Sequence, residues 1–359
     1  MELTRVCSLF SGCGGIDKGM IGGFSYLGAE FKKNPFEIVY AIDNDKYAVD
    51  IYNKNFTHKS ICEDIRNVSE SSLPEHDLLL GGFPCQSFSI VAQNPPRLGY
   101  KDDRGKLFFE IVRILKAKKP RFFILENVKG LLSANKKMAF PMIIKELESA
   151  GYIIKHQVLN SFDFGVPQKR ERVFIVGFKY HSDCELFKFP KSNVDNEKKV
   201  LKHVLSKSVD EKYFFSEKAV LGMMRVKEKM NKGRAQNIEF PCNTISAHLA
   251  KVSLNSTDPV LEENGRYRRF TPSEAAKIQS FPDDFDFSSV SENRQYRAIG
   301  NAVPPLLMWH MTQSLISVIQ SRKNNIFSKN FAKKPNLTNN RVQNNRPHRV
   351  PQVASSILI

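Results

Sequence analysis

The first half of the chain alternates short apolar runs with amphipathic segments, and this alternation limits the possible folds more than any other feature of the sequence. Strands are predicted at 5–10, 38–42, 77–80, 121–126, 152–159 and 172–178. Helices are predicted between them at 15–28, 47–55, 107–119 and 140–151. In the third of these helices, Leu107, Ile111 and Leu115 fall on one face. Strands and helices that alternate at this spacing predict a doubly wound, mostly parallel α/β sheet.

The alternation ends near residue 178, which indicates a second, smaller domain. The following residues, to about 267, are charged and irregular, with short helices predicted at 197–204 and 219–230. Order returns where Thr271 and Glu274 form a capping box, and a last apolar helix is predicted at 304–319. We therefore expect a large domain at 1–180 completed by 285–321, a smaller domain at 181–284, and a basic tail at 322–359 that is too poor in apolar residues to be ordered.

The formal charge of +17 indicates a polyanionic partner, nucleic acid first and a membrane surface second. The tail carries eight lysines or arginines and no acid, so the rest of the chain keeps about +9. No apolar run approaches the ~18 residues of a membrane span, and the N-terminus lacks the apolar core of a signal peptide. We expect a soluble, cytoplasmic protein. Its six cysteines form no C-x-x-C pair, so neither a metal site nor a disulfide framework is predicted.

A glycine-rich turn, LFSGCGG at 9–15, joins the first predicted strand to the first predicted helix. Glycines there allow the backbone to approach a nucleotide-like ligand closely. The pattern lacks the third glycine of the dinucleotide fingerprint, so a mononucleoside cofactor is favoured over NAD. An acid after the second strand, Asp43, is placed to take ribose hydroxyls.

Cys85 follows a proline at the end of the strand and glycine pair DLLLGGFPC, 77–85. Most cysteines in such chains are inert buried thiols, and we expect this of the other five. The proline and the turn residues make a buried position unfavourable for Cys85, and a nucleophile needs exposure near cationic groups. The sequence therefore predicts a reactive thiol at this strand end.

Two further groups of charged residues lie next to predicted strands. Glu126 ends the strand at 121–126, where loss of solvent can raise its pKa and keep it partly protonated. Taken alone, an acid at a strand end is more often a solvated loop residue. The segment PQKRERVF at 167–174 contains four charged residues. In isolation such a segment is more often a solvated hairpin. Its two arginines are also able to form a guanidinium cluster that binds an anion.

Seven segments, in this order, resemble the motif series of the DNA cytosine-5 methyltransferases of bacterial restriction-modification systems. They are LFSGCGG, GGFPCQSFS, DDRGKLFFE, ENVKGLL, FGVPQKRERVFIVGF, RRFTPSEAAKIQSFPDDF and YRAIGNAVPP. The resemblance runs from the N-terminus to about Ile319 and omits only a variable segment and the tail. It implies an S-adenosylmethionine-dependent, Rossmann-like methyltransferase fold with a smaller target-recognition domain.

The resemblance implies a chemical role for each charged motif. Cys85 is the thiolate that adds to carbon 6 of cytosine, which makes carbon 5 nucleophilic enough to accept a methyl group. Glu126 holds ring nitrogen 3 and the exocyclic amine. Arg172 holds the base carbonyl, with Arg170 nearby. Because such a pocket cannot reach a base inside a duplex, the cytosine must be flipped out. The same resemblance adds to the catalytic set Gln86 and Asn127.

For the cofactor, S-adenosylmethionine, the resemblance implies a pocket built from distant parts of the chain. Asp43 is assigned to the ribose, Asp64 to the adenine amine, and Asn301 to completing the pocket. Two residues depart from the family pattern: Asp43 stands where glutamate is more frequent, and Asn44 where an aromatic residue often stacks on adenine. The other cofactor-binding residues implied are Phe10, Gly12, Gly14, Gly15, Ile65, Pro84, Leu107 and Ala302.

For double-stranded DNA, the resemblance implies contacts from the mobile loop after Cys85 and from the variable segment. Thr244 and Ile245 match the one recurring element of that segment. The residues expected to contact DNA are Ser89, Arg104, Arg225, Arg234, Thr244 and Ile245, with Lys227, Lys229 and Lys232 as further basic candidates. We expect a monomer, and a cognate restriction endonuclease acting on the same site is a further partner that the resemblance allows.

Four alternatives remain open at this point. An RNA-directed member of the same family would share the catalytic parts. A DNA-binding regulator on an inactive scaffold would predict loss of Cys85 or Glu126, yet both are present. An amine methyltransferase is disfavoured because NPPR at 94–97 lacks the aromatic residue of that motif, and a dehydrogenase is disfavoured by the glycine pattern.

Overall fold

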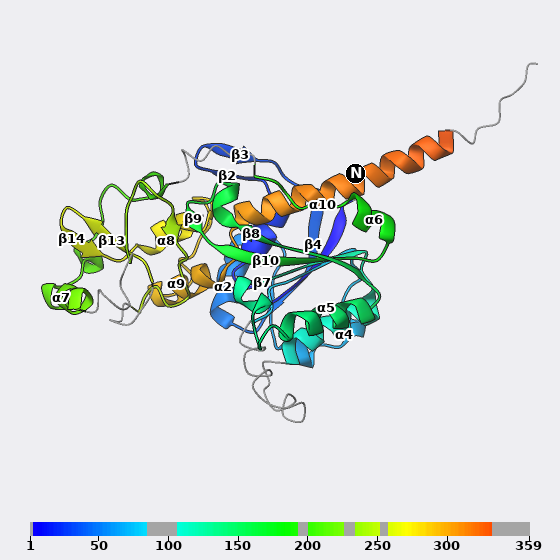
Figure 1. Ribbon diagram of the computed structural model, residues 1–359, viewed down its shortest axis with the longest axis horizontal. Helices are drawn as coiled ribbons and strands as arrows, with labels where there is room; N and C mark the ends of the chain where they lie inside the picture. The colour runs from blue at the N-terminus through cyan, green and yellow to red at the C-terminus, as the bar shows by residue number, and fades with distance from the viewer. Residues whose placement is uncertain (1–2, 85–105, 193–199, 226–233, 252–257, 332–359) are drawn as a thin grey trace, which may run out of the picture. The chain divides into compact units, whose positions relative to one another are not determined.

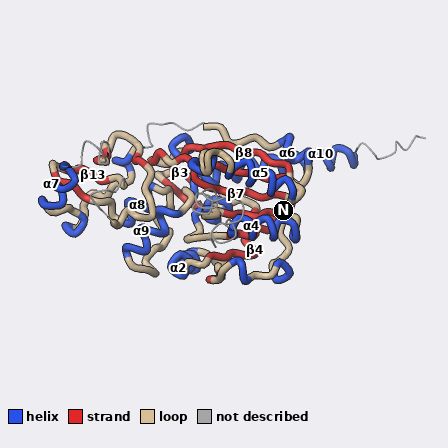
Figure 2. Tube along the Cα trace, turned by 60° about the horizontal axis from the view of Figure 1, so that its bottom comes forward, coloured by secondary structure: helices blue, strands red, loops and turns tan. Residues whose placement is uncertain are grey.

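The computed structural model describes residues 3–84, 106–192, 200–225, 234–251 and 258–331. Within them a seven-stranded sheet has the order β5-β4-β1-β6-β7-β10-β8. These strands are β1 (Thr4–Leu9), β4 (Phe36–Asp43), β5 (Ile61–Cys62), β6 (Leu78–Gly81), β7 (Phe122–Val128), β8 (Ile153–Asn160) and β10 (Glu171–Phe178). The first five in this order are parallel, whereas β10 is antiparallel to both β7 and β8. The predicted mostly parallel sheet is confirmed, and its strands lie side by side in Figure 2.

Alternate residues of the central strands enter two separate hydrophobic cores, one on each face of the sheet. Leu79, Phe123 and Val173 pack with α4 (Lys106–Lys118) and α5 (Ala139–Ser149). Their neighbours Leu78, Phe122 and Phe174 pack on the opposite face. The helices there are α1 (Gly15–Ile21), α2 (Lys46–Asn55) and the first part of α10 (Pro305–Phe331). Because strand side chains alternate between faces, continuous apolar runs such as Leu78–Gly81 are buried on both sides. The sheet is therefore doubly wound (Figure 1).

The first predicted helix, 15–28, is wrong beyond Ile21. Gly22 and Gly23 adopt φ values of 67° and 70°, and this left-handed backbone ends α1. The chain then forms a hairpin of β2 (Phe24–Tyr26) and β3 (Ala29–Phe31) around a two-residue turn with positive φ at Leu27 and Gly28.

The segment after β10 folds into short elements. It contains α6 (His181–Leu186), α7 (Glu217–Arg225), and a small sheet of β11 (Ala235–Gln236), β13 (Val260–Glu263) and β14 (Arg266–Arg268). A further pair, β12 (Cys242–Asn243) and β9 (Gln168–Lys169), joins this segment to the residues before β10. Of the helix predicted at 197–204, the described part is only a 3-10 turn at Leu201–His203.

The C-terminal helices are α8 (Pro272–Ile278), α9 (Glu292–Asn301) and α10. The capping box of Thr271 and Glu274 is confirmed. The remaining 3-10 turns are Ile65–Asn67, Glu70–Ser72, Lys129–Leu132, Ser161–Phe164 and Glu211–Tyr213.

Two compact units divide the chain, one at Met1–Ile319 and the other at Gln320–Ile359. A smaller domain at 181–284 stays a prediction. The predicted disordered tail is wrong at its start, because α10 continues past Ile319 to Phe331. None of the helices in the described part of the chain combines the length and apolar character of a membrane span.

Candidate active site

The charged centre of the site lies at the ends of two neighbouring strands. Glu126 of β7 and Arg172 of β10 form an ion pair, with 3.0 Å between Oε1 and Nε and side chains that are 13% and 11% exposed. The apolar residues Phe122–Leu125 are fully buried and anchor β7, and the strand becomes less buried from Glu126. The antiparallel register places Phe174 opposite Glu126 and Arg172 opposite Val128, so the ion pair forms diagonally across the two strands.

Burial raises the pKa of Glu126, while the positive charges of Arg172 and Arg170 and the hydrogen bond from Arg172 oppose the shift. The net effect is upward, because loss of solvent destabilises the carboxylate more than the two guanidinium groups stabilise it. A carboxyl group in this state is able to hold a proton and to donate it to a ring nitrogen. The arrangement therefore suits an acid that stabilises charge on a bound base.

The loop that leads to Cys85 begins beside this ion pair. A Cβ built on Gly82 would lie 3.7 Å from Glu126 Oε2. Asn127 Nδ2 donates to the carbonyl oxygen of Phe83 at 2.8 Å, and both residues are buried. Asn127 thus holds the backbone two residues before Cys85, a role that suits its place in the predicted set. Pro84 is half-buried, whereas Cys85, Gln86, Ser89 and Arg104 lie outside the described residues.

The predicted cofactor turn lies at the carboxyl end of β1. Phe10 and Gly12 both have φ near 55°, and Gly14, with φ 94°, is the N-cap of α1. A Cβ on Gly12 would meet nothing within 4 Å, so this backbone faces open space that a ligand is able to approach. Asp43 Oδ2 accepts a hydrogen bond from Gly12 N at 2.8 Å, which joins the acid to the turn.

Asp43 is already engaged by the backbone on both carboxylate oxygens, since Oδ1 accepts from Asp45 N at 2.8 Å. Each oxygen keeps a second lone pair for a ribose hydroxyl. Burial raises the pKa of Asp43, and hydrogen bonds from Asp45 and Gly12 oppose the shift. Glu63 N donates to the Asp43 carbonyl at 3.1 Å, which brings the next residue, Asp64, near Asp43.

Asp64 is paired with Arg66 at 2.6 Å, and the hydrogen bonds from Arg66 lower the pKa of its carboxyl group. The assignment of Asp64 to an adenine amine therefore requires it to accept a further hydrogen bond beside Arg66. Ile65, next to it, is buried, and Leu107 is half-buried against the core of the α4 and α5 face. Asn44 lies between Asp43 and Asp45 in this turn and is exposed.

The C-terminal end of α9 meets the glycine turn, although the two are nearly 300 residues apart. A Cβ on Gly15 would lie 2.4 Å from the Val303 carbonyl oxygen and 3.2 Å from Ala302 Cβ. Ala302 is 9% exposed, whereas Asn301 is exposed. The structure thus brings Ala302 and Val303 to the turn, and the assignment of Asn301 and Ala302 to the cofactor pocket stays a prediction. The fit of a mononucleoside cofactor to this turn rests on the open backbone at Gly12 and on Asp43 beside it.

A buried acid below the turn was not predicted. Asp17 in α1 is 0% exposed, and Ser8 Oγ donates to its Oδ1 at 2.7 Å. Burial raises its pKa to about 6, and the hydroxyls of Ser8 and Tyr52 oppose the shift. The Tyr52 hydroxyl lies close to the carboxylate without making a hydrogen bond of normal geometry. The signal in the sequence was an acid two residues after Gly15, in a short helix whose other residues, apart from Lys18, are glycine or apolar.

Three residues of the predicted site are buried in this structure. Arg170 is 2% exposed and donates only to backbone carbonyls, so its side chain is part of the interior. Arg234 is 5% exposed, with Nε donating to the Asp258 carbonyl at 2.8 Å. Ile245 is fully buried in the hydrophobic core. The predicted roles of these residues in catalysis or in DNA contact stay predictions.

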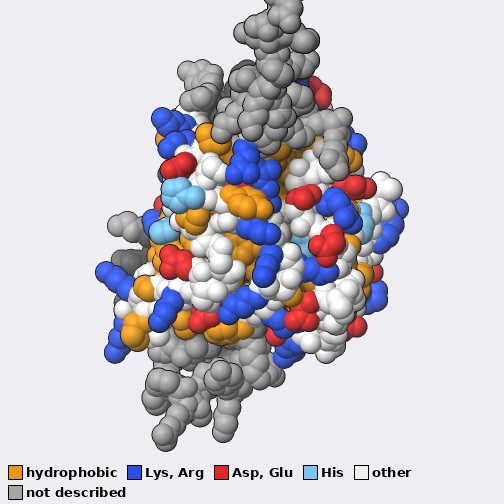
Figure 3. All heavy atoms as spheres, turned by 90° about the vertical axis from the view of Figure 1, so that its right-hand side faces the viewer, with side chains coloured by type: hydrophobic (Ala, Val, Ile, Leu, Met, Phe, Trp, Pro, Cys, Tyr) orange, Lys and Arg blue, Asp and Glu red, His pale blue; other side chains and the backbone are white. Residues whose placement is uncertain are grey.

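Thr244 is exposed, as a DNA contact requires, and its Oγ1 donates to the Lys169 carbonyl at 2.7 Å. Arg225 is the last residue of α7, and its side chain is outside the description, as are residues Lys227, Lys229 and Lys232. On the face drawn in Figure 3, basic side chains are interspersed with acidic and apolar ones and do not form one continuous basic patch.

The described cysteines agree with the prediction of inert thiols at four positions. Cys7, Cys13, Cys184 and Cys242 are buried, and Cys62 is exposed. Burial raises the pKa of Cys13 to about 12 and that of Cys7 and Cys242 further, so these thiols stay protonated at neutral pH. No three His, Cys, Asp or Glu side chains converge as a metal site requires within the described ranges.

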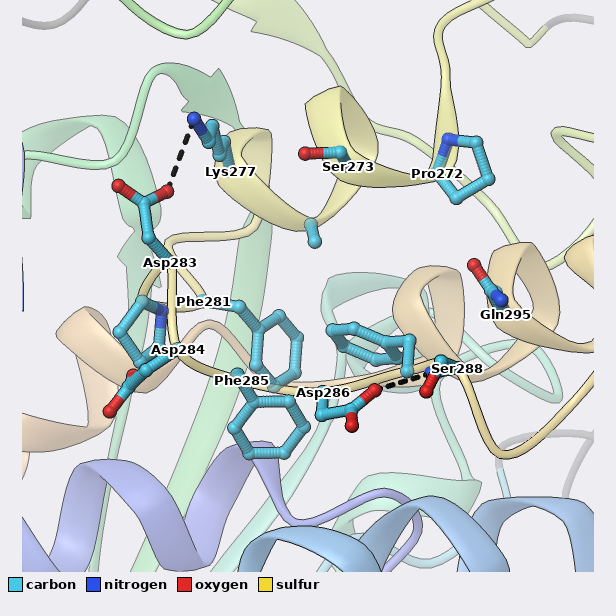
Figure 4. A pocket seen from close by; sticks show the side chains of 13 residues that line it. Pro272, Ser273, Lys277, Phe281, Asp283, Asp284, Phe285, Asp286, Ser288 and Gln295 are labelled. Carbon is cyan, nitrogen blue, oxygen red and sulfur yellow. Dashed lines mark hydrogen bonds and ion pairs between the residues drawn. The ribbon is translucent and has the colours of Figure 1, made fainter.

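A pocket outside this centre lies between α8, the loop after it and α9. Figure 4 shows the rings of Phe281 and Phe285 side by side in it, with centroids 4.7 Å apart. Asp283 pairs with Lys277 at 3.1 Å on its rim. Because neither the Glu126–Arg172 pair nor the glycine turn contributes to its lining, this pocket is separate from the charged centre.

Comparisons with known proteins agree with this geometry. Residues 4–317 match the family model of C-5 cytosine-specific DNA methylases. The chain is 36% identical over 332 residues to the Type II methyltransferase M.FnuDI of Fusobacterium nucleatum, covering 84% of this chain and 90% of that one. It is 37% identical over 310 residues to the Type II methyltransferase M.NlaX of Neisseria lactamica, covering 84% and 92%.

Among solved structures, the methyltransferase EhMeth of Entamoeba histolytica superposes with a TM-score of 0.71 at 19% identity, covering 89% of this chain and 99% of that one. The Dnmt2 methyltransferase of S. pombe superposes with a TM-score of 0.68 at 22% identity, again over 89% and 99%. At these identities the likeness shows the fold alone.

Proposed function

The chain belongs to the family of C-5 cytosine-specific DNA methylases and is a DNA cytosine-5 methyltransferase, and on this premise we propose that it methylates a flipped-out cytosine within a specific short sequence of duplex DNA through Cys85. The observation that carries the proposal is the buried Glu126–Arg172 pair beside the loop that Asn127 holds two residues before Cys85. This places an acid and a guanidinium group next to the start of the nucleophile's loop.

In the proposed reaction the Cys85 thiolate forms a bond to carbon 6 of the cytosine, and the electron pair of the 5,6 double bond is delocalised from carbon 5 through carbon 4 onto ring nitrogen 3. Glu126 holds ring nitrogen 3 and, with its raised pKa, supplies the proton that neutralises the charge arriving there. Arg172 pairs with Glu126 and donates to the base carbonyl. Carbon 5 then forms a bond to the methyl group as the methyl–sulfonium bond breaks, and S-adenosylhomocysteine leaves with that electron pair. The carbon 5 proton is lost to water, the bond between carbon 6 and sulfur breaks to release the Cys85 thiolate, and the proton on ring nitrogen 3 returns to Glu126, which restores the aromatic ring and the free enzyme.

S-adenosylmethionine supplies an activated methyl group when it is bound. The residues proposed to hold it are the turn at Phe10–Gly12, Asp43 and Asp64 for the ribose and adenine, and Asn301 at the end of α9. Three features of the chain fit such a molecule: open backbone at Gly12, an acid joined to that turn, and the close approach of Gly15 to Ala302.

Duplex DNA is favoured over RNA as the substrate because the relatives in the comparisons are Type II methyltransferases of restriction-modification systems. The charge of +17 suits a polyanion of either kind. We further propose that the enzyme acts as a monomer in the cytoplasm, and that an endonuclease recognising the same sequence is its biological counterpart.

The test is to incubate the protein with labelled S-adenosylmethionine and duplex DNA or RNA and then to digest the product to nucleosides. We expect 5-methylcytosine from DNA. Label in methyladenine or N4-methylcytosine, or in RNA only, would refute the proposal.

One variant and its matched control test the nucleophile. Cys85→Ser should abolish turnover and keep cofactor binding, and only the parent protein should form a covalent adduct with 5-fluorocytosine DNA. Cys62→Ser is the matched control, because Cys62 is the exposed cysteine of the described residues and has no role in the proposed reaction. An adduct formed by Cys85→Ser would contradict the assignment.

A further inference from the structure

Arg170 joins three parts of the chain through one buried side chain. Its Nη1 donates to the Ile245 carbonyl at 2.9 Å, and its Nη2 donates to the carbonyls of Gly300 and Ala302 at 2.9 and 3.0 Å. Ile245 follows β12, whereas Gly300 and Ala302 flank Asn301 at the end of α9. The side chain is 2% exposed, so water does not compete for these carbonyls.

Two buried glutamines extend the same network. Gln279 Nε2 donates to the Ile299 carbonyl at 2.8 Å and to the Ala302 carbonyl at 3.2 Å. Gln168 Nε2 donates to Gln279 Oε1 at 2.8 Å, and its Oε1 accepts from Ile245 N at 2.9 Å. Gln168 and Gln279 are both 0% exposed. The backbone on each side of Asn301 is thus held by fully buried donors.

The end of α9 is also pressed directly against the segment that contains Thr244 and Ile245. A Cβ on Gly300 would lie 2.2 Å from the Ser246 carbonyl oxygen and 2.4 Å from Ala247 N. Only a residue without a side chain allows this approach. A small shift of either backbone would therefore be transmitted to the other, and Arg170 bonds to both.

We infer that Arg170 is a positioning residue, which fixes the backbone of Asn301 against the glycine turn and ties the Thr244–Ile245 segment to the same guanidinium group. The inference rests on the proposed function, in which Asn301 contributes to the cofactor pocket and Thr244 faces DNA. It assigns Arg170 a role distinct from that of Arg172, whose Nε pairs with Glu126. Arginine is required because its planar fork reaches several carbonyls at once, which a lysine ammonium group at this place does not.

The test compares Arg170→Lys with a matched control, Arg268→Lys. Arg268 is also fully buried and pairs with Glu263 and Glu274 at 2.6 and 2.8 Å. Its hydrogen bonds go to these two side chains and to the Arg269 carbonyl, which lie outside 299–302. Both variants keep the positive charge. The affinity for S-adenosylhomocysteine is measured by calorimetry, together with the midpoint of thermal unfolding and the kinetic constants for duplex DNA.

We expect Arg170→Lys to weaken S-adenosylhomocysteine binding about tenfold, as loss of one charge-assisted hydrogen bond predicts, and to raise the KM for DNA more than it lowers kcat. Arg268→Lys should lower the unfolding midpoint but leave the affinity for S-adenosylhomocysteine unchanged. A drop in kcat with unchanged affinity would instead make Arg170 a catalytic residue. Equal loss of affinity in both variants would reduce its role to general stability, and either result overturns the inference.

A second variant covers the case in which Arg170→Lys does not fold. Gln279→Met removes the donor to Ile299 and Ala302 without adding a charge, and it should weaken S-adenosylhomocysteine binding several-fold. Wild-type affinity in this variant would overturn the inference. The binding measurement needs no turnover, so its outcome is independent of the nucleoside analysis. The nucleoside analysis tests the proposed function on the parent protein alone.

Discussion

Asp17 should make the stability of the protein depend on pH in a way that Asp17→Asn removes. Its carboxyl group is fully buried and has its pKa raised from 3.8 to about 6. Below pH 3.8 the group is protonated in both the folded and the unfolded chain. Between pH 3.8 and 6 the unfolded chain ionises first, so stability falls as the pH rises, and above pH 6 the loss is complete.

A shift of about two pKa units corresponds to a total loss of about 3 kcal/mol, since one unit is worth about 1.4 kcal/mol. About half of it, or roughly 1.5 kcal/mol, falls between pH 5 and pH 8. Urea unfolding of the wild-type protein and of Asp17→Asn at these two pH values measures this change in the free energy of unfolding. All other titrating groups are common to both proteins, so their contributions cancel in the difference.

Two results would refute this reasoning about Asp17. One is a difference in the free energy of unfolding between the two proteins that is equal at pH 5 and pH 8. The other comes from Ser8→Ala, which removes the hydrogen bond that favours the ionised carboxylate. That variant should steepen the pH dependence, and a flatter profile would contradict the assignment of the effect to Asp17.

The remaining predictions concern catalysis and the glycine turn. Glu126→Gln should lower kcat roughly 10²- to 10⁴-fold because the amide cannot donate the proton. Wild-type activity should fall as rising pH ionises Glu126, and the pH profile of the variant should lack this fall. An unchanged profile would exclude Glu126 as the acid. Gly15→Ala should cost about 1–3 kcal/mol and weaken cofactor binding, because its Cβ would lie 2.4 Å from the Val303 carbonyl oxygen. Gly130→Ala, whose Cβ would meet its nearest atom at 3.9 Å, is the control, and equal losses in thermal unfolding would contradict the steric argument.

The alternation of apolar strands and amphipathic helices was sufficient to predict the sheet. The strands predicted at 77–80 and 121–126 are β6 and β7 with bounds shifted by one or two residues. Local patterns of this kind are readable because a strand buried on both faces must be apolar throughout. The prediction of a helix at 15–28 was wrong because its second half depends on distant contacts and not on a local pattern. Two adjacent glycines end the helix, and the hairpin after them packs against residues distant in sequence, including Leu306 and Trp309.

Glu126, Arg172 and Asn127 were named from their motifs alone, and the structure pairs the first two and holds the Phe83 backbone with the third. What the sequence left undetermined was which basic residues lie inside. Arg170 and Arg172 are two positions apart in one charged run, yet Arg170 is 2% exposed and donates to three carbonyls from other parts of the chain, whereas Arg172 meets Glu126.

Only the tertiary structure decided this, because burial depends on what packs over a side chain and not on the residue itself. The covering segments, around Ile245 and 299–302, lie about 75 and 130 residues from Arg170. Arg234 and Ile245 were predicted to contact DNA without information on the segments that pack around them. Periodicity along the chain thus specified the sheet and its motifs, while contacts between distant segments specified which of the charged groups are buried against the backbone and which stay partly exposed at the strand ends.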